Sequence, residues 1–135
     1  MENFSSMIQI QHEEQYTLLV PSAQADKISL ETLADKVTQQ MEEGHKNYII
    51  HLEHVKKLPA DYEYVLENIN QIVNKEDGLL IISGAPKELE EKLEEKEVIT
   101  TPTLDEATDY IFMEEIEKQF RSEHDGEQEE WEKED

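Results

Sequence analysis

The sequence contains no cysteine, and this absence excludes two kinds of chemistry. Without thiols the chain has neither a disulfide framework nor a thiolate that acts as a nucleophile or a metal ligand. Other signatures of catalysis are also missing, because the sequence has no G-x-S-x-G elbow and no carboxylate pair whose opposing environments can be argued from sequence. We therefore expect a protein that is not an enzyme and that needs no cofactor.

Positive charge is scarce, with 12 Lys and Arg against 34 Asp and Glu and a net charge of −22. Such a chain repels phosphate backbones and anionic lipid surfaces, so neither nucleic acid nor a membrane is an expected partner. Long apolar runs are also missing, since none approaches the ~20 residues of a membrane span. Residues 1–10 lack the positive and apolar regions of a signal peptide. The expected compartment is the cytoplasm.

The length of 135 residues suits one domain. We assign residues 1–120 to it. The remaining segment, residues 121–135, reads RSEHDGEQEEWEKED, with one aromatic residue and no periodic apolar face. Because such a segment cannot recover the entropy of ordering, we expect it to form an acidic, disordered tail.

The most informative stretch is residues 47–74, where the apolar pattern changes period midway. Tyr48, Ile49, Ile50 and Leu52 form a compact run that is typical of a strand buried on both faces. A helix is expected to begin near Pro59 or Ala60, because apolar residues then recur at three- and four-residue steps. These residues are Tyr62, Val65, Leu66, Ile69, Ile72 and Val73. The join between strand and helix is a favoured place for function, because open α/β sheets leave a crevice at the carboxyl ends of their strands.

Before this stretch, residues 7–10 and 16–20 have the pattern of two strands joined as an antiparallel hairpin. Pro21 is expected to end the second strand because it lacks the donor that a continuing ladder needs. Ser29 then caps a predicted helix that ends at Gly44. The apolar stripe of that helix is Leu30, Leu33, Ala34, Val37 and Met41.

After it, residues 79–82 predict a second buried strand, and residues 83–86 an ordinary strand-to-helix turn. A short helix over residues 86–94 follows, with Leu89 and Leu93 toward the core. Residues 98–99 predict an edge strand. Residues 103–106 form a capping box in which the Thr103 hydroxyl accepts the Glu106 amide and the Glu106 carboxylate accepts the Thr103 amide. The last helix carries Leu104, Ala107, Tyr110, Ile111, Ile116 and Phe120.

These elements predict an α/β fold in the order β-β-α-β-α-β-α-β-α. Strands separated by helices of this length pair in parallel, so we expect a mixed sheet of four or five strands with a parallel centre, packed against helices. The residues predicted to be buried are Val37, Ile49, Ile50, Leu80 and Ile81.

From about residue 15 to residue 120, this order and several local strings resemble the STAS domain, the fold of bacterial anti-sigma factor antagonists and of the cytoplasmic tails of sulfate transporters. In that family a buried strand of the form V-L-D-L is followed by the string D-S-S-G-L-G, whose second serine is phosphorylated by a kinase that is also the anti-sigma factor. Residues 49–52, IIHL, resemble the strand, and residues 59–64, PADYEY, take the place of the signature. The C-terminal TPTLDEA also resembles the family's ending.

The resemblance makes Asp61 the equivalent of the phosphoacceptor, and Tyr62 and Tyr64 stand where the family has glycine. Asp61 offers no hydroxyl to phosphorylate. It supplies one charge and two oxygens against the ~1.5 to 2 charges and three oxygens of phosphoserine, so it is a partial mimic of the phosphorylated form. A structural explanation stands beside this one, because an acid in the first turn of a helix interacts favourably with the helix dipole.

The resemblance implies a non-enzymatic regulatory module that binds a protein partner, such as an anti-sigma factor or a kinase-like regulator. Its contact residues would be Pro59, Ala60, Asp61, Tyr62 and Tyr64. The spacing of the two tyrosines places them on different faces of the helix, so we expect at most one to be buried. An alternative is a carrier of a small ligand, a lipid or a nucleotide, with a pocket beneath the same helix.

His51, Glu53 and His54 are candidate metal ligands. Residues 51 and 53 share a face if the strand continues, whereas residue 54 leaves it. No further His or Cys lies nearby in sequence to complete a tetrahedral set. We therefore predict no metal site here.

Overall fold

The computed structural model describes residues 8–23 and 32–134, and side chains up to residue 121. In chain order its elements are β1 (Ile8–His12), β2 (Thr17–Pro21), α3 (Leu33–Glu42), β3 (Asn47–His51), α4 (Tyr62–Lys75), β4 (Leu79–Ser83), α5 (Lys87–Glu95), β5 (Ile99–Thr101) and α6 (Leu104–Glu134). The predicted β-β-α-β-α-β-α-β-α order is confirmed.

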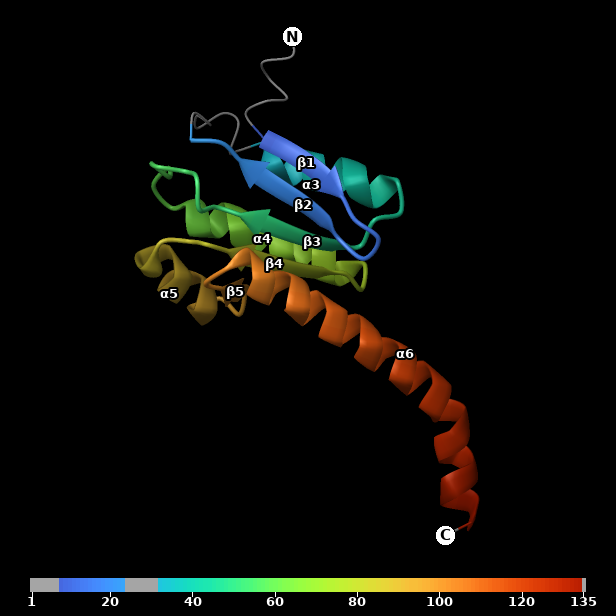
Figure 1. The fold of residues 1–135 in the computed structure, drawn as a ribbon. Helices are drawn as coiled ribbons and strands as arrows, with labels where there is room; N and C mark the ends of the chain where they lie inside the picture. The colour runs from blue at the N-terminus through green and yellow to red at the C-terminus, as the bar shows by residue number, and fades with distance from the viewer. Residues whose placement is uncertain (1–7, 24–31, 135) are drawn as a thin grey trace.

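Within the described residues, five strands form one sheet in the order β1-β2-β3-β4-β5 (Figure 1). Strands β1 and β2 pair antiparallel, and every other neighbouring pair is parallel. The mixed sheet with a parallel centre is therefore confirmed. All five residues predicted to be buried are buried, because β3 and β4 lie inside the sheet and helices cover both of its faces.

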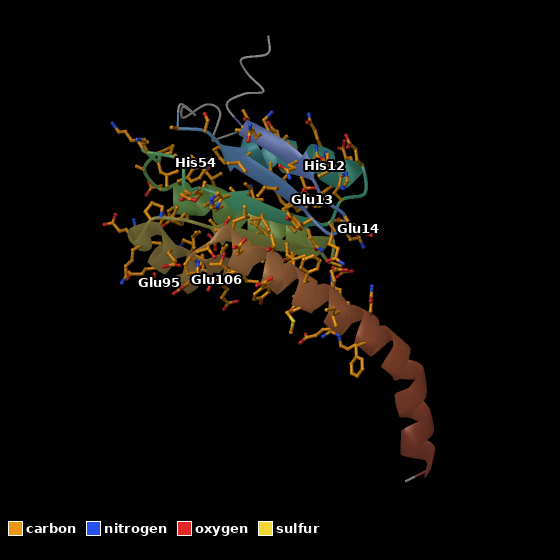
Figure 2. The ribbon with its side chains drawn as sticks, viewed as in Figure 1. His12, Glu13, Glu14, His54, Glu95 and Glu106 are labelled. Carbon is orange, nitrogen blue, oxygen red and sulfur yellow. The ribbon has the colours of Figure 1, made fainter. Side chains whose placement is uncertain are left out.

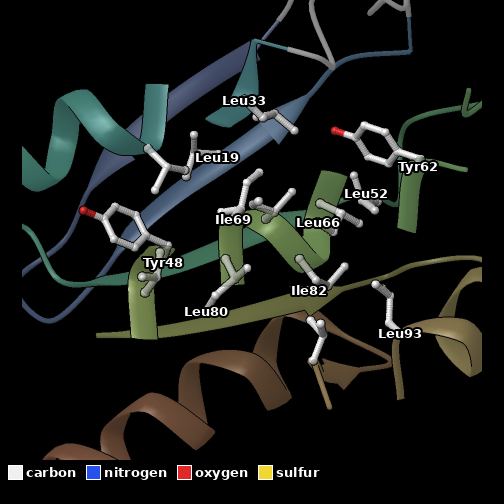
Figure 3. Packing of buried hydrophobic residues seen from close by; sticks show 14 of the residues in the cluster. Leu19, Leu33, Tyr48, Leu52, Tyr62, Leu66, Ile69, Leu80, Ile82 and Leu93 are labelled. Carbon is white, nitrogen blue, oxygen red and sulfur yellow. The ribbon is translucent and has the colours of Figure 1, made fainter. Parts of the chain in front are cut away.

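Two separate clusters fill the two faces of the sheet. On one face, side chains from β2, β3 and β4 pack against α3, α4 and α5, as Figure 3 shows for ten labelled residues. On the other face, Leu18, Ile49 and Ile81 pack against Ala107 and Ile111 of α6. The alternation of side chains along each strand thus divides the core into a large and a small half.

The N-terminal hairpin has the predicted pairing, with boundaries shifted by one or two residues. Ile8 pairs with Pro21 and His12 pairs with Thr17. Pro21 is the last residue of β2, as predicted, and it lies beyond the part of β2 that pairs with β3, so its missing donor costs no bond to β3. The predicted strand residue 7 lies outside the described residues.

Helix α3 begins after Thr32, and the predicted cap Ser29 and stripe residue Leu30 lie outside the described residues. Its C-terminal end matches the prediction. Gly44 has a positive φ of 101° and donates to the Met41 carbonyl, while the next amide, that of His45, donates to the Gln40 carbonyl. This pair of bonds is the Schellman motif, which glycine favours because it has no Cβ.

The predicted start of α4 near Pro59 or Ala60 is wrong, because the helix begins at Tyr62. Asp61, just before it, has φ 61° and ψ 24°, in the left-handed region. A right-handed helix cannot pass through such a residue, so α4 can only begin after it.

The C-terminal elements follow the prediction closely. Leu89 and Leu93 are the buried residues of α5, and β5 forms the edge beside β4. In the capping box the Glu106 amide donates to Thr103 Oγ1 at 3.2 Å, as predicted, but the Glu106 carboxylate accepts from the Thr103 hydroxyl at 3.1 Å rather than from the Thr103 amide.

Helix α6 continues to Glu134 and leads away from the sheet (Figure 1). It therefore runs through the segment for which the sequence predicts disorder, and the disorder of residues 121–135 in solution stays a prediction. Within the described residues, no helix combines the length and the apolar character that a membrane crossing requires.

Candidate functional site

The candidate site is built on the connection from β3 to α4, at the carboxyl ends of the central strands. The connection leaves the sheet at Leu52, whose amide donates to the Ser83 carbonyl of β4 at 2.9 Å. A turn follows, closed by the Val55 amide donating to the Leu52 carbonyl at 3.1 Å. Val55 is buried and Leu58 packs partly against the core, so two apolar anchors hold the connection against the domain.

Asp61 ends this connection as the N-cap residue of α4 and is exposed to solvent. The sequence placed it in the first turn of the helix, and that placement is wrong for the reason given by its left-handed backbone. Within the described part of the chain, the Asp61 side chain makes no capping hydrogen bond to the helix. Its carboxylate is therefore not used by its own helix terminus, although its backbone carbonyl accepts the Tyr64 amide at 3.1 Å.

Glu63 takes the position that the sequence analysis gave to Asp61. It is the acidic residue in the first turn of α4, and its side chain is buried. A negative charge there lies near the positive end of the helix dipole, which stabilises it. The helix-dipole explanation for an acid at this helix start thus applies to Glu63, and it applies also to Asp61 as the N-cap residue.

The two tyrosines separate as predicted. Tyr62 is 2% exposed and turns inward, where Figure 3 shows it with Leu52 and Leu66 in the large core cluster. Tyr64 is 55% exposed, and its ring lies under the Lys96 ammonium, with 4.3 Å between Nζ and the ring centroid. That cation–π contact ties Tyr64 to the end of α5 rather than to the β3–α4 connection.

A surface pocket of about 310 Å³ brings together four of the five predicted contact residues, namely Pro59, Ala60, Asp61 and Tyr62. Its opposite wall comes from the start of α5. The complete lining is Val55, Lys56, Leu58, Pro59, Ala60, Asp61, Tyr62, Glu63, Pro86, Glu88, Leu89 and Lys92. Tyr64 does not belong to this lining. The lining combines apolar side chains, such as Val55 and Leu89, with acidic and basic ones, such as Asp61 and Lys92, and protein interfaces have a similar mixture.

The residues from α5 were missed by the sequence analysis. The signal that would have found them is topological. Strands β3 and β4 are parallel neighbours, so the helices that follow them start at the same edge of the sheet. Pro86, the N-cap of α5, therefore lies in the same pocket as Asp61, the N-cap of α4.

The space between α4 and the sheet, where the carrier alternative places its ligand, is closely packed in the described residues. The space between α4 and the sheet is filled by Tyr62, Leu66, Ile69 and Val73, which are all 2% exposed or less. Close packing of this kind leaves no volume for a lipid chain or a nucleotide.

The structure brings His51, Glu53 and His54 together, contrary to the expectation that residue 54 leaves the shared face. The strand ends at His51, and the turn at residues 53–54 brings His54 back toward it. The three side chains offer ligand atoms that all lie within 4.8 Å of one another. The expectation failed because it assumed that the strand continued to residue 54.

Comparison with known proteins agrees with this architecture. A variant of RsbS from Moorella thermoacetica has a TM-score of 0.65 and 13% identity, covering 77% of this chain and 93% of that one. A putative anti-sigma factor antagonist from Thermotoga maritima has a TM-score of 0.65 and 14% identity, covering 81% and 97%. The anti-sigma factor antagonist SpoIIAA in its unphosphorylated form has a TM-score of 0.63 and 14% identity, covering 77% and 96%.

No protein-family model matches the sequence, and a search of curated proteins finds no match. At such low identity the similarity to solved structures establishes the fold alone. The chain has the STAS fold of the anti-sigma factor antagonists, which confirms the resemblance predicted from its sequence.

Proposed function

We propose that this protein is a non-enzymatic regulatory module that binds a protein partner through the start of α4 and the adjoining start of α5. The observation that carries the proposal is Asp61, an exposed carboxylate held in a left-handed conformation outside its own helix. Within the described residues that side chain makes no capping hydrogen bond, and it belongs to the lining of the pocket. Charged groups positioned in this way add specificity to a protein interface.

The STAS fold supports the type of partner. Three structures with this fold are anti-sigma factor antagonists or RsbS, so an anti-sigma factor or a kinase-like regulator is the partner class that we propose. Asp61 stands at the position of the family's phosphoserine and cannot be phosphorylated as a hydroxyl is. The module would therefore present a fixed single charge in place of a switched one. We place it in the cytoplasm, where such regulators act.

Affinity capture from the native host tests the surface. The bait is the full chain, compared with Asp61→Arg and with Asp77→Arg as a matched control. Asp77 is also exposed and left-handed, with φ 65°, but it follows the opposite end of α4, so both substitutions reverse a charge and impose similar strain. We expect Asp61→Arg to lose the partner and Asp77→Arg to retain it. Equal capture by all three baits would contradict the proposed surface.

A phosphorylation assay tests whether the charge at residue 61 is fixed. After incubation with a kinase that is also an anti-sigma factor, we expect mass mapping to find no phosphate on residues 59–64 of the wild type, because Asp61 offers no hydroxyl. Asp61→Ser should remain a poor substrate, since Tyr62 and Tyr64 stand where the family has glycine. Adding Tyr62→Gly and Tyr64→Gly should improve phosphorylation but destabilise the protein, since two helical glycines cost about 1 kcal/mol each and the buried Tyr62 ring is lost.

A further inference from the structure

We infer that His51, Glu53 and His54 form a binding site for a divalent zinc-type metal ion at the carboxyl end of β3. The site stands apart from the proposed function, because neither histidine lines the pocket beside Asp61. In the described part of the chain, the potential ligand atoms of these three side chains all lie within 4.8 Å of one another.

The ligand set has the chemistry of a zinc site. Two imidazoles and one carboxylate are the protein ligands of several catalytic zinc centres, which keep a fourth position for water. A set without thiolates and with two imidazoles also disfavours Mg²⁺ and Ca²⁺, which prefer oxygen ligands. At bond lengths of about 2.0 to 2.2 Å, ligand atoms around a tetrahedral ion lie roughly 3.3 to 3.5 Å apart. His54 and Glu53 are exposed and free to turn by the small distance that this requires.

The buried member of the set is already oriented. His51 is 6% exposed, its Nδ1 lies 2.8 Å from Ser83 Oγ, and its Nε2 lies 2.9 Å from Glu53 Oε1. Histidines that bind metals generally donate their other ring N–H to a protein group, which fixes the tautomer and the ring plane. The Ser83 hydroxyl can act either as a hydrogen-bond donor or as an acceptor toward His51 Nδ1. It donates to Nδ1 while the Nε2–H bonds to Glu53, and it accepts from Nδ1–H once Nε2 holds an ion.

The loop after β4 packs against His51 and Glu53 and so helps to fix their positions. Gly84 has a positive φ of 69°, and a Cβ built on it would lie 3.0 Å from His51 Cε1 and 3.1 Å from Glu53 Cβ. The Gly84 backbone thus packs directly against His51 and Glu53, so the site has a rigid wall on one side and solvent on the other. Such support by a neighbouring element is what a preorganised metal site needs.

Zinc titration calorimetry on the full chain without a histidine tag tests the inference. We expect one Zn²⁺ per chain. His54→Ala and Glu53→Gln should each weaken binding by more than about tenfold, and Ser83→Ala by about tenfold through the loss of its contact with His51. The exposed variants are the decisive ones because they leave the core intact. The control is His12→Ala with His45→Ala, a stacked pair with ring centroids 4.5 Å apart. His12 lies toward the opposite end of the strands from His54 (Figure 2).

The protein carries a net charge of −22, so cation binding to its surface carboxylates needs a separate readout. Substitution with Co²⁺ in a millimolar excess of Mg²⁺ provides one, because a tetrahedral site with two imidazoles gives visible absorption bands that carboxylates alone do not. We expect these bands in the wild type and in the His12/His45 control, and their loss in His54→Ala. Equal Zn²⁺ affinity in all variants, or bands that persist in His54→Ala, would overturn the inference.

Discussion

At the scale of single residues, Asp61 is the position most relevant to the proposed function, because its backbone and its side chain serve different purposes. The left-handed conformation is unfavourable for most residues other than glycine, by about 1 to 2 kcal/mol, and less so for aspartate. The carboxylate makes no capping bond among the described contacts that would offset this cost. A residue whose conformation is unfavourable and whose side chain is unused by the fold is a candidate for function rather than stability.

The left-handed backbone of Asp61 and its lack of a capping bond predict the stability of two variants. Asp61→Gly should be at least as stable as the wild type, since glycine accepts φ 61° and no capping bond is lost. Asp61→Ala should be about 1 kcal/mol less stable than Asp61→Gly. Urea unfolding measures both. Equal stability of the alanine and glycine variants would show that residue 61 is not left-handed in solution.

Tyr48 predicts a dependence on alkaline pH. Its side chain is buried and donates a hydrogen bond to the His45 carbonyl. Burial, with a smaller contribution from Glu43, raises its pKa from 10.0 to about 12. Because the folded-state pKa is raised, the contribution to stability is fully present below pH 10 and is lost as the pH rises toward 12.

The wild type should therefore lose about 2 kcal/mol of unfolding free energy between pH 9 and pH 12 relative to Tyr48→Phe. The comparison cancels the effect of Tyr16, whose pKa is also raised, by burial and by Glu13, in both proteins. Denaturant unfolding at several pH values measures the difference. Parallel pH profiles for the two proteins would contradict the assignment to Tyr48.

At the scale of elements, α6 combines a docked start with an exposed continuation. Ala107 and Ile111, near its start, are buried against the sheet, whereas Ile116 and Phe120 are more than half exposed. Two polar contacts extend the docked part, from Asn47 to Glu115 at 2.8 Å and from Lys118 to the Asp77 carbonyl at 3.4 Å. All of these contacts lie before residue 121.

Deleting residues 121–135 should therefore shift the thermal midpoint by less than about 2 °C. If the segment is disordered, as its composition predicts, the deletion should also leave the total helical circular dichroism signal unchanged. A drop of many degrees would show that Trp131 docks on the domain. A proportionate loss of helical signal would show that α6 continues in solution.

The elements themselves could be predicted because each depends on a local pattern. The stripe of Leu66, Ile69 and Val73 fixes the buried face of α4, and the apolar run from Tyr48 to Ile50 fixes β3. The start of α4 could not be predicted in this way. It coincides with the left-handed conformation of Asp61, at the end of a connection that packs on the domain through Val55 and Leu58, and such packing is a tertiary feature.

The site was predicted in part, and the resemblance to the family supplied that part. It gave Pro59, Ala60, Asp61 and Tyr62, which the structure places around one pocket. The contribution of α5 was missed because it follows from the pairing of β3 with β4. His54 was named as a candidate ligand, but its approach to His51 was not foreseen because the strand ends three residues before it. Neither feature has a signature in a sequence pattern of period 2 or 3.6.

At the scale of the whole molecule, both candidate sites lie at the same edge of the parallel sheet. The Asp61 pocket and the His51 cluster both lie at the carboxyl ends of β3 and β4, and the start of α5 adjoins each of them. The whole chain carries a net charge of −22, and such a charge favours a partner with a basic face. We therefore propose that a protein partner covers this edge of the domain.

Hydrogen exchange on the complex with the captured partner tests that claim most directly. We expect binding to slow amide exchange in residues 55–64 and 86–92, the two segments that contain the pocket lining, and to leave exchange in α3 and α6 unchanged. The Asp61→Arg protein, mixed with the same partner, should show no slowing at either segment. Protection confined to α6 or to α3, with residues 55–64 exchanging as in the free protein, would contradict the account.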